Sequence, residues 1–444
     1  MQLFSSLVED DYVSISMNEE SQTGPNTERI DDFQDDQKIS QKDLLDLASE
    51  YIDSISEELR PVSLRIHDNP ELNYGEFIAH ETLVKFMKSR KGWKVTPSAY
   101  GIATAFIAEF DSGKKGPVIS YNAEYDALKG IGHSCGHNLI AICSVGAALA
   151  ASAAIKNFSL PGKVILFGTP AEEGGGGKIK LLKAGAYSDH KADINLISHP
   201  GIVPASALVR TNAYMNFRVE YFGKEAHAAA SPWEGINALD ALITAYNALS
   251  VLRQQTMPGD IIQGHITDGG AAPNIIHAYA AGIFVVRSLS KSRLEMLRKR
   301  VNNCFEAGAE ATGAKLKMTE VMAYDDHVPN KVLGVICRKA FNQLGREEIP
   351  TTELDLIRGA TQASTDQGNI SYMMPSLSLG FKIESQDGPH NPGFAAAART
   401  RKAHDAALKA AKALAVTGLE VLLDERVLVA AKEEFKEMLE GRGR

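Results

Sequence analysis

The stretch GKVILFGTPAEEGGGGK, residues 162–178, decides the fold class of this chain. It runs from a short apolar segment into two adjacent glutamates and then into four glycines. Two similar apolar segments, GPVISYN (116–122) and DINLISHPG (193–201), are also bounded by Gly, Pro or Asp, and helix-length segments separate them from it. Short apolar strands that alternate with helices are typical of a mostly parallel sheet with helices on its faces. The sequence therefore predicts an α/β domain.

Residues of metal-binding type follow the predicted strands. Each strand, together with a further apolar run at 376–382, leads into such residues. In chain order they are Glu124, Asp126, Cys135, His137, Glu172, Glu173, His199 and His390. In open α/β sheets the ligand crevice lies beyond the carboxyl ends of the strands, so residues far apart in sequence meet there. We expect these side chains to share one site.

The donor types in this set indicate the metal. Thiolate, imidazole and carboxylate together suit zinc, with manganese as the alternative where carboxylate and water dominate. More than three ligands and a spare carboxylate indicate two ions that share a water. Successive side chains on an extended segment diverge, so one of Glu172 and Glu173 is expected to bind metal while the other acts as general base.

Composition and charge set the outer limits of the interpretation. With 444 residues, 44% of them hydrophobic, the chain is long enough for two domains. Its net charge of -8 comes from residues 1–40, which hold ten acidic and two basic residues, so this segment is expected to be a disordered acidic tail. The remaining chain is neutral and has no basic stripe, which argues against nucleic-acid binding.

One long uncharged run, residues 139–155, is interpreted as a buried helix because it is short for a membrane span and rich in Ala, Ser and Gly. We expect no membrane partner. Four scattered cysteines form no disulfide framework, and no leader of the secretory type opens the sequence. A cytoplasmic location is the resulting prediction.

The glycines at 174–177 do not form a phosphate-binding loop. A Walker loop places Gly five residues before its Gly-Lys pair and Ser or Thr after the Lys, and this chain has Glu172 and Ile179 at those places. The glycines are instead expected to let the backbone turn tightly behind Glu173 and to start a helix at Lys178.

Several stretches of the chain resemble peptidase family M20, a family of metal-dependent amidohydrolases. They are NAEYDALKGIGHSCGHN (122–138), GTPAEEGGGGK (168–178), SHPG (198–201) and GKEAHAAASPWEGINALDA (223–241). The branch with the aminobenzoyl-glutamate hydrolases and peptidase M20 domain-containing protein 2 is the most similar, because it shares TPAEEGGGGK and STDQGNISYMMPS (364–376). The resemblance covers roughly residues 41–420.

The resemblance implies a role for most of the polar residues named above. It places Cys135 between two metal ions and makes Glu172 the general base and acid, with Asp126 orienting a ligand. The five ligands it implies are Cys135, His137, Glu173, His199 and His390. His133 is the alternative to His137, and the role of Glu124 stays open.

The family resemblance also implies an inserted lid domain that pairs two subunits into a homodimer. Residues 211–324 show a strand, helix, strand, strand, helix, strand order that suits a ferredoxin-like layer, which leaves 41–210 and 325–444 as the catalytic metal-binding domain. By resemblance, His227 of the lid stabilises the oxyanion in the partner's site. Asn274 and Arg287 are expected to hold the polar end of the substrate. His277 stands where relatives have Pro.

Together these observations predict a metal-dependent amidohydrolase that cleaves the amide bond of a small molecule, either a dipeptide or an N-acyl amino acid. One alternative is an amide-forming or acyl-transfer enzyme on the same fold. Another is a non-catalytic metal-binding regulatory protein, although such a protein would have no use for the second glutamate.

Overall fold

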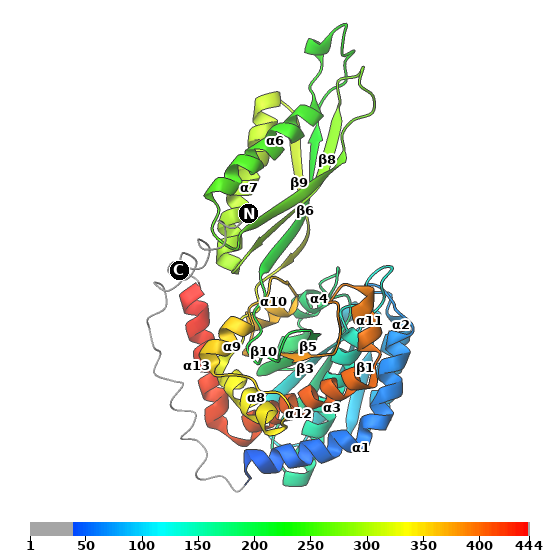
Figure 1. Ribbon diagram of the computed structural model, residues 1–444, viewed down its shortest axis with the longest axis vertical. Coiled ribbons are helices and arrows are strands. Elements are labelled where there is room, and N and C mark those ends of the chain that lie inside the picture. Colours follow the sequence, from blue (N-terminus) through cyan, green and yellow to red (C-terminus); the bar gives the residue numbers. More distant parts are fainter. Residues whose placement is uncertain (1–38, 443–444) are drawn as a thin grey trace, which may run out of the picture. The chain divides into compact units, whose positions relative to one another are not determined.

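The computed structural model describes residues 39–442 of the chain. The predicted acidic tail, residues 1–40, lies outside the described residues except for its last two positions. The described residues build two separate sheets (Figure 1).

The larger sheet has six strands in the order β1-β2-β4-β3-β5-β10. Neighbours among β4, β3, β5 and β10 are parallel, whereas β1, β2 and β4 pair in antiparallel fashion. The bounds are β1 Trp93–Pro97, β2 Phe106–Asp111, β3 Val118–Glu124, β4 Lys163–Thr169, β5 Ile194–Gly201 and β10 Ser376–Lys382. The predicted mostly parallel sheet is confirmed, and it carries an antiparallel edge as well.

Helices pack on both sides of this sheet. Helices α3 and α12 contact the central strands, and α1 and α8 pack against them. The alternate side chains of β4, Ile165 and Phe167, instead join a core cluster with residues of α4, α5 and α10. The helix bounds are α1 Gln41–His67, α2 Phe77–Lys88, α3 His137–Phe158, α4 Gly177–Lys183, α5 Ala186–Asp189, α8 Lys331–Gln343, α9 Thr352–Arg358, α10 Gln367–Ser371, α11 Pro392–Ala398, α12 Arg401–Leu423 and α13 Glu425–Arg442.

Helix α3 is the central helix of this half of the protein. By length and composition it could cross a membrane, but 94% of its most apolar window is buried inside the protein. Its small residues allow neighbouring helices to approach closely. Gly146, for example, faces Ala411 of α12 and Leu59 of α1, and an added Cβ would lie in ordinary van der Waals contact, 3.5 Å from each. The expectation of a buried helix is therefore confirmed, and its first residue, His137, is fixed at the edge of the sheet.

The smaller sheet belongs to the inserted segment, residues 213–324. Its four antiparallel strands lie in the order β7-β8-β6-β9, and α6 and α7 pack on it to enclose a separate hydrophobic core. The bounds are β6 Ala213–Phe222, α6 Ala238–Leu252, β7 Ile261–Asp268, β8 Tyr279–Ser288, α7 Lys291–Thr312 and β9 Lys315–Tyr324. This β-α-β-β-α-β order is the ferredoxin-like layer that the sequence predicts.

Glu420 of α12 gives the fold a pH dependence. Its side chain is buried, and the loss of solvation raises its pKa to about 7, against a hydrogen bond from Gln41 that lowers it. A carboxyl group whose pKa is higher in the folded than in the unfolded protein costs no stability below the unfolded pKa. The cost then grows as pH rises from the unfolded pKa through the folded pKa, because the folded state resists ionisation. We therefore expect the free energy of unfolding at pH 8, measured by urea titration, to be about 1 to 3 kcal/mol higher for Glu420→Gln than for the unsubstituted protein.

The same comparison at pH 4 is expected to show almost no difference, because Glu420 is then protonated in both states. Glu433→Gln on the exposed side of α13 serves as the control. An equal gain for Glu420→Gln at both pH values would contradict the assignment of the effect to this carboxyl group.

Candidate metal centre

The metal-type residues sit where the parallel strands end. Glu124 is the last residue of β3, His199 lies near the end of β5, and His137 opens α3. Glu172 and Glu173 belong to the turn after β4. This placement follows from the sheet, because parallel strands with helical crossovers bring their carboxyl ends to one edge.

All five predicted ligands meet at this edge. The donor atoms of Cys135, His137 and His199 lie within 4.8 Å of one another, and so do those of Cys135, Glu173 and His390. Cys135 belongs to both triads, and its Sγ lies 3.3 Å from Nε2 of His199. The arrangement therefore contains two donor sets with a shared thiol, and a third group of His137, Glu172 and Glu173 lies beside them.

Two buried donor atoms confirm that the arrangement fits metal ions. Nε2 of His137 and Oε1 of Glu173 are buried and have no hydrogen-bond partner. Such atoms are costly unless something pairs with them. Both belong to the donor sets just described, and thiolate, imidazole and carboxylate are zinc-type ligands. The residues present thus fit a pair of divalent ions.

Asp126 fixes the orientation of two of these ligands. Its Oδ1 lies 2.9 Å from Nδ1 of His137, which leaves Nε2 of that ring facing the centre. Its Oδ2 accepts a hydrogen bond of 3.0 Å from the backbone N–H of Glu173. Carboxylates in this position set the tautomer and basicity of a ligating imidazole.

The adjacent glutamates take different positions. Glu173 Oε1 lies 3.4 Å from Nε2 of His390 and 3.8 Å from Nε2 of His137. Glu172 is also buried, and its Oε2 lies 3.9 Å from Nε2 of His137. Burial, with the charges of Glu124 and Glu173, raises the pKa of Glu172 well above its ordinary value. The backbone carbonyl of Glu172 accepts a hydrogen bond of 2.6 Å from the hydroxyl of Tyr324.

The glycine run allows the chain to fold back on itself behind these glutamates. A Cβ on Gly177 would lie 1.8 Å from the carbonyl oxygen of Pro170, a distance that no side chain tolerates. Gly176 has a φ of +61°, in the left-handed region that favours glycine. The tight turn expected from the sequence is present.

The structure also joins residues that the sequence did not connect. The side chain of Lys178 is fully buried and forms ion pairs with Glu124 and Asp366. The carboxylates of Glu124, Glu172 and Asp366 form a further group whose atoms lie within 4.8 Å of one another. The only sequence signal was a lysine directly after four glycines, which we expected to start a helix.

The remaining predicted residues lie apart from this cluster. His227 is exposed, and its Nδ1 accepts hydrogen bonds from the backbone of Ala229 and Ala230. Asn274 is exposed beside the same loop, where its backbone carbonyl accepts a hydrogen bond from the backbone N–H of Ala228. Arg287 lies elsewhere, donating to Ser364 at 2.9 Å and stacking 4.6 Å over Tyr214. Their roles stay predictions.

His133, the alternative ligand, belongs to none of the metal-type groups within residues 39–442. Its ring stacks on His67 with centroids 6.0 Å apart, and burial lowers its pKa to about 3. His277, the departure from the family pattern, packs where a Cβ on Gly270 would lie 2.1 Å from its Nδ1. The imidazole of His277 therefore occupies the space that a side chain at position 270 would need, and only glycine fits there.

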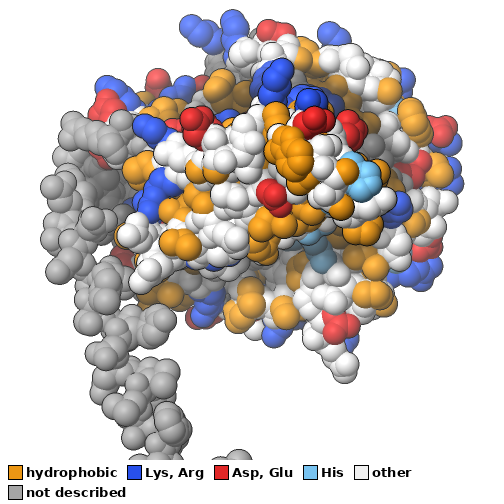
Figure 2. All heavy atoms as spheres, turned by 90° about the horizontal axis from the view of Figure 1, so that it is seen from above, with side chains coloured by type: hydrophobic (Ala, Val, Ile, Leu, Met, Phe, Trp, Pro, Cys, Tyr) orange, Lys and Arg blue, Asp and Glu red, His pale blue; other side chains and the backbone are white. Residues whose placement is uncertain are grey.

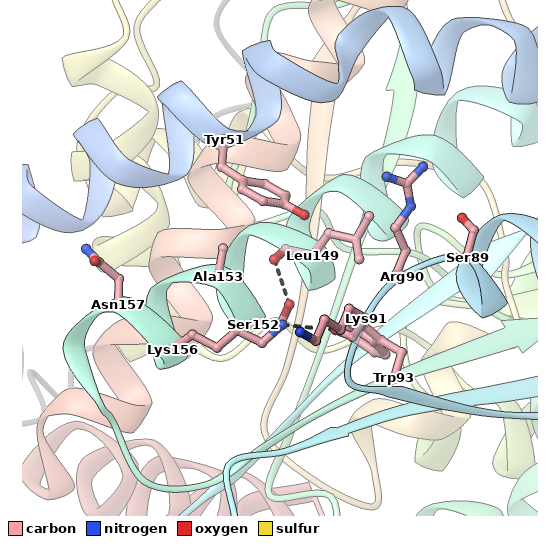
Figure 3. A pocket seen from close by; sticks show the side chains of 10 residues that line it. All are labelled: Tyr51, Ser89, Arg90, Lys91, Trp93, Leu149, Ser152, Ala153, Lys156 and Asn157. Carbon is pink, nitrogen blue, oxygen red and sulfur yellow. Dashed lines mark hydrogen bonds between the residues drawn. The ribbon is translucent and has the colours of Figure 1, made fainter.

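A separate hollow of about 520 Å³ lies at the far end of α3 (Figure 3). The lining residues are Tyr51, Ser89, Arg90, Lys91, Trp93, Leu149, Ser152, Ala153, Lys156 and Asn157. His137 begins α3, whereas the lining residues of this helix run from Leu149 to Asn157, so about 18 Å of helix or more separates the hollow from the metal-type cluster. The hollow is therefore not part of the candidate centre.

Comparisons with known proteins agree with this geometry. Residues 210–312 match the family model of the peptidase dimerisation domain of M20 enzymes. The chain is 39% identical over 400 residues to the Xaa-Arg dipeptidase of Mus musculus, covering 88% of this chain and 91% of that protein. The chain belongs to peptidase family M20.

A more distant relative in sequence and a solved structure agree with this assignment. A p-aminobenzoyl-glutamate hydrolase component of Escherichia coli is 27% identical over 84% of this chain and 91% of its own length. A dinuclear metal-binding M20 peptidase from Bacillus subtilis superimposes with a TM-score of 0.63 at 18% identity, covering 83% of this chain and 99% of that one. Membership of the family makes this chain a hydrolase that acts on amide bonds with the help of metal.

The shared thiol leads to a prediction about metal content. Cys135→Ser removes a donor from both triads, whereas His390→Ala removes one from a single triad. We expect zinc-loaded, desalted Cys135→Ser to retain less metal than His390→Ala, as measured by elemental mass spectrometry. His265→Ala, an exposed histidine of β7, serves as the control and should retain the full content. Greater loss in His390→Ala than in Cys135→Ser would contradict the shared position of the thiol.

Proposed function

We propose that this M20 hydrolase is a zinc dipeptidase that acts on dipeptides with a basic carboxy-terminal residue. The observation that carries this proposal is Glu172, a buried carboxylate beside the two donor triads that is placed to act as a base. The 39% identity to a mammalian Xaa-Arg dipeptidase supports the substrate class. The cysteine and three histidines of the site favour zinc over manganese.

The proposed mechanism uses the residues of this chain in sequence. Two divalent ions, when bound, would lower the pKa of the attacking water and polarise the scissile carbonyl. Glu172 takes the proton from that water and later delivers it to the leaving amine. The neighbouring carboxylates raise the pKa of Glu172 and bound cations would lower it, so the two effects together suit a group that must both accept and release a proton.

We further propose that the enzyme works as a homodimer through the inserted segment. Its helix α6 and edge strand β7 present several exposed hydrophobic side chains. They are Ile243, Tyr246 and Val251 of α6 and Ile266 of β7. Figure 2 shows hydrophobic side chains interspersed with charged ones of both signs on the face that it displays. Unpaired edge strands and apolar patches of this kind are typical of subunit interfaces.

In such a dimer the two paired loops that carry His227 and Asn274 would act in the partner's active site. Both residues are exposed, as this role requires. His227 would stabilise the oxyanion, and Asn274 with Arg287 would hold the carboxylate of the dipeptide. The fork of the Arg287 guanidinium suits that carboxylate, and its present partner, Ser364, is a neutral hydroxyl.

A substrate screen tests the proposed chemistry. The zinc-loaded enzyme and its Glu172→Gln variant are incubated with a pooled library of Xaa-Arg, Xaa-Lys and acidic dipeptides, N-acyl amino acids and aminobenzoyl-glutamate. We expect the unsubstituted enzyme to cleave the basic dipeptides fastest, and Glu172→Gln to lose at least about 100-fold in kcat with its metal content unchanged. Mass spectrometry of the products gives both results.

Preferred cleavage of acidic dipeptides or acyl amino acids would overturn the substrate assignment and leave the hydrolase. Absence of any cleavage by the metal-loaded enzyme would favour the amide-forming or the non-catalytic alternative.

Mixing the protomers of two variants tests the shared active site. Glu172→Gln and His227→Ala should each be inactive alone, because each dimer then lacks one group in both sites. A mixed dimer carries one site with both groups intact, so activity should return when the two variants are unfolded, combined and refolded. Each variant refolded alone is the control. No recovery in a sample shown to contain mixed dimers would place His227 in its own protomer's site.

A further inference from the structure

A buried cluster of four charged groups lies next to the candidate metal centre. The ammonium of Lys178 is fully buried, and its Nζ lies 2.6 Å from Oε1 of Glu124. It also forms an ion pair with Asp366, whose Oδ2 accepts a hydrogen bond of 2.9 Å from the backbone N–H of Lys178. Glu172 is the third carboxylate of this pocket. The cluster thus contains one positive group and three carboxylates.

The chain is built to bring this lysine inwards. Lys178 is the second residue of α4, and it directly follows the glycine run that folds back on Pro170. Asp366 is held just as firmly, because the next residue, Gln367, donates to Asn195 of β5 at 2.7 Å and accepts from Asn122 of β3 at 2.7 Å. Both partners are therefore anchored to the central strands.

Glu124 connects this cluster to the metal centre. One oxygen, Oε1, pairs with Lys178, while the other, Oε2, lies 3.6 Å from Nε2 of His137. Nε2 of His137 faces the metal-type centre, because Asp126 holds the other ring nitrogen, Nδ1. A single carboxylate thus contacts the buried ammonium on one side and a metal-ligand nitrogen on the other.

A purely stabilising role does not account for this arrangement. Taking an ammonium and carboxylates out of water costs several kcal/mol per ion, and apolar side chains of similar volume often stabilise a protein as well or better. The three carboxylates also lie close enough to bind a cation of their own. The ammonium occupies the place where such a cation would sit.

We propose that Lys178 is a positioning residue, a fixed cation that keeps Glu124 and Glu172 in place beside the metal pair and prevents their charges from binding metal. This deepens the proposed function, because it assigns a role to Glu124 and explains how a general base is held among like charges. Lys178 pairs with Glu124 and Asp366 rather than with the five predicted ligands, so its influence passes through the carboxylates.

The test compares zinc affinity with turnover in Lys178→Met, which keeps the length of the side chain and removes its charge. Zinc affinity of the metal-free full chain is measured by competition with a chelating dye. Loss of the ammonium should tighten zinc binding by at least about tenfold, because the carboxylates are then free to bind metal. It should also lower kcat by about 10- to 100-fold with KM nearly unchanged, because Glu172 is displaced.

These two effects have opposite signs, and general structural damage would weaken zinc binding and turnover together. The double variant Lys178→Met/Asp366→Asn removes one positive and one negative charge, so both zinc affinity and kcat should move back towards those of the unsubstituted protein. Lys412→Met is the matched control. This lysine pairs with Asp53 on the surface, and its loss should change neither quantity.

Zinc affinity that is equal or weaker in Lys178→Met would overturn the proposal, as would a double variant no closer to the unsubstituted protein than the single one. If Lys178→Met does not fold, Lys178→Gln replaces it, with zinc binding again expected to tighten by at least about tenfold; an equal or weaker affinity would then overturn the proposal. The zinc measurement needs no substrate, so it remains decisive even if the proposed dipeptidase activity fails.

Discussion

The carboxylate of Asp126 is the interaction on which the rest of the site depends. One oxygen orients the ring of His137 at the start of α3, and the other holds the backbone of Glu173 in the turn after β4. These two elements follow different strands, so a single buried residue sets the distance between a helix and a loop. Removal of either hydrogen bond would free a donor of one triad: His137 belongs to the first and Glu173 to the second.

Much of the centre could be predicted from the sequence because its parts are local. Each ligand follows a short apolar run, and the rule that parallel strands end at one edge is enough to bring Cys135, His199 and His390 together. The inserted layer was equally predictable, since its strands and helices alternate with clear periodicity. The catalytic roles of these residues are predictions that rest on the family resemblance.

The parts that the sequence did not reveal depend on contacts over long distances along the chain. The outermost strand of the antiparallel edge, β1, carries no long apolar run, because most of its residues are exposed. Asp366 lies 188 residues from Lys178, and nothing near either residue indicates the other. Local patterns cannot show such pairings.

In the proposed function, the two halves of the protein divide the chemistry between them for a physical reason. The residues of the metal-type cluster must be held rigidly, and the strand ends and α3 provide that from within a large buried core. A group that stabilises the developing charge needs to approach only after the substrate has bound, and the inserted segment has its own core, so it can carry exposed loops without disturbing the sheet. Tyr324 connects the two, since its position at the end of β9 lets its hydroxyl hold the backbone of Glu172. The inserted segment therefore helps to place Glu172, the proposed base, in the same protomer.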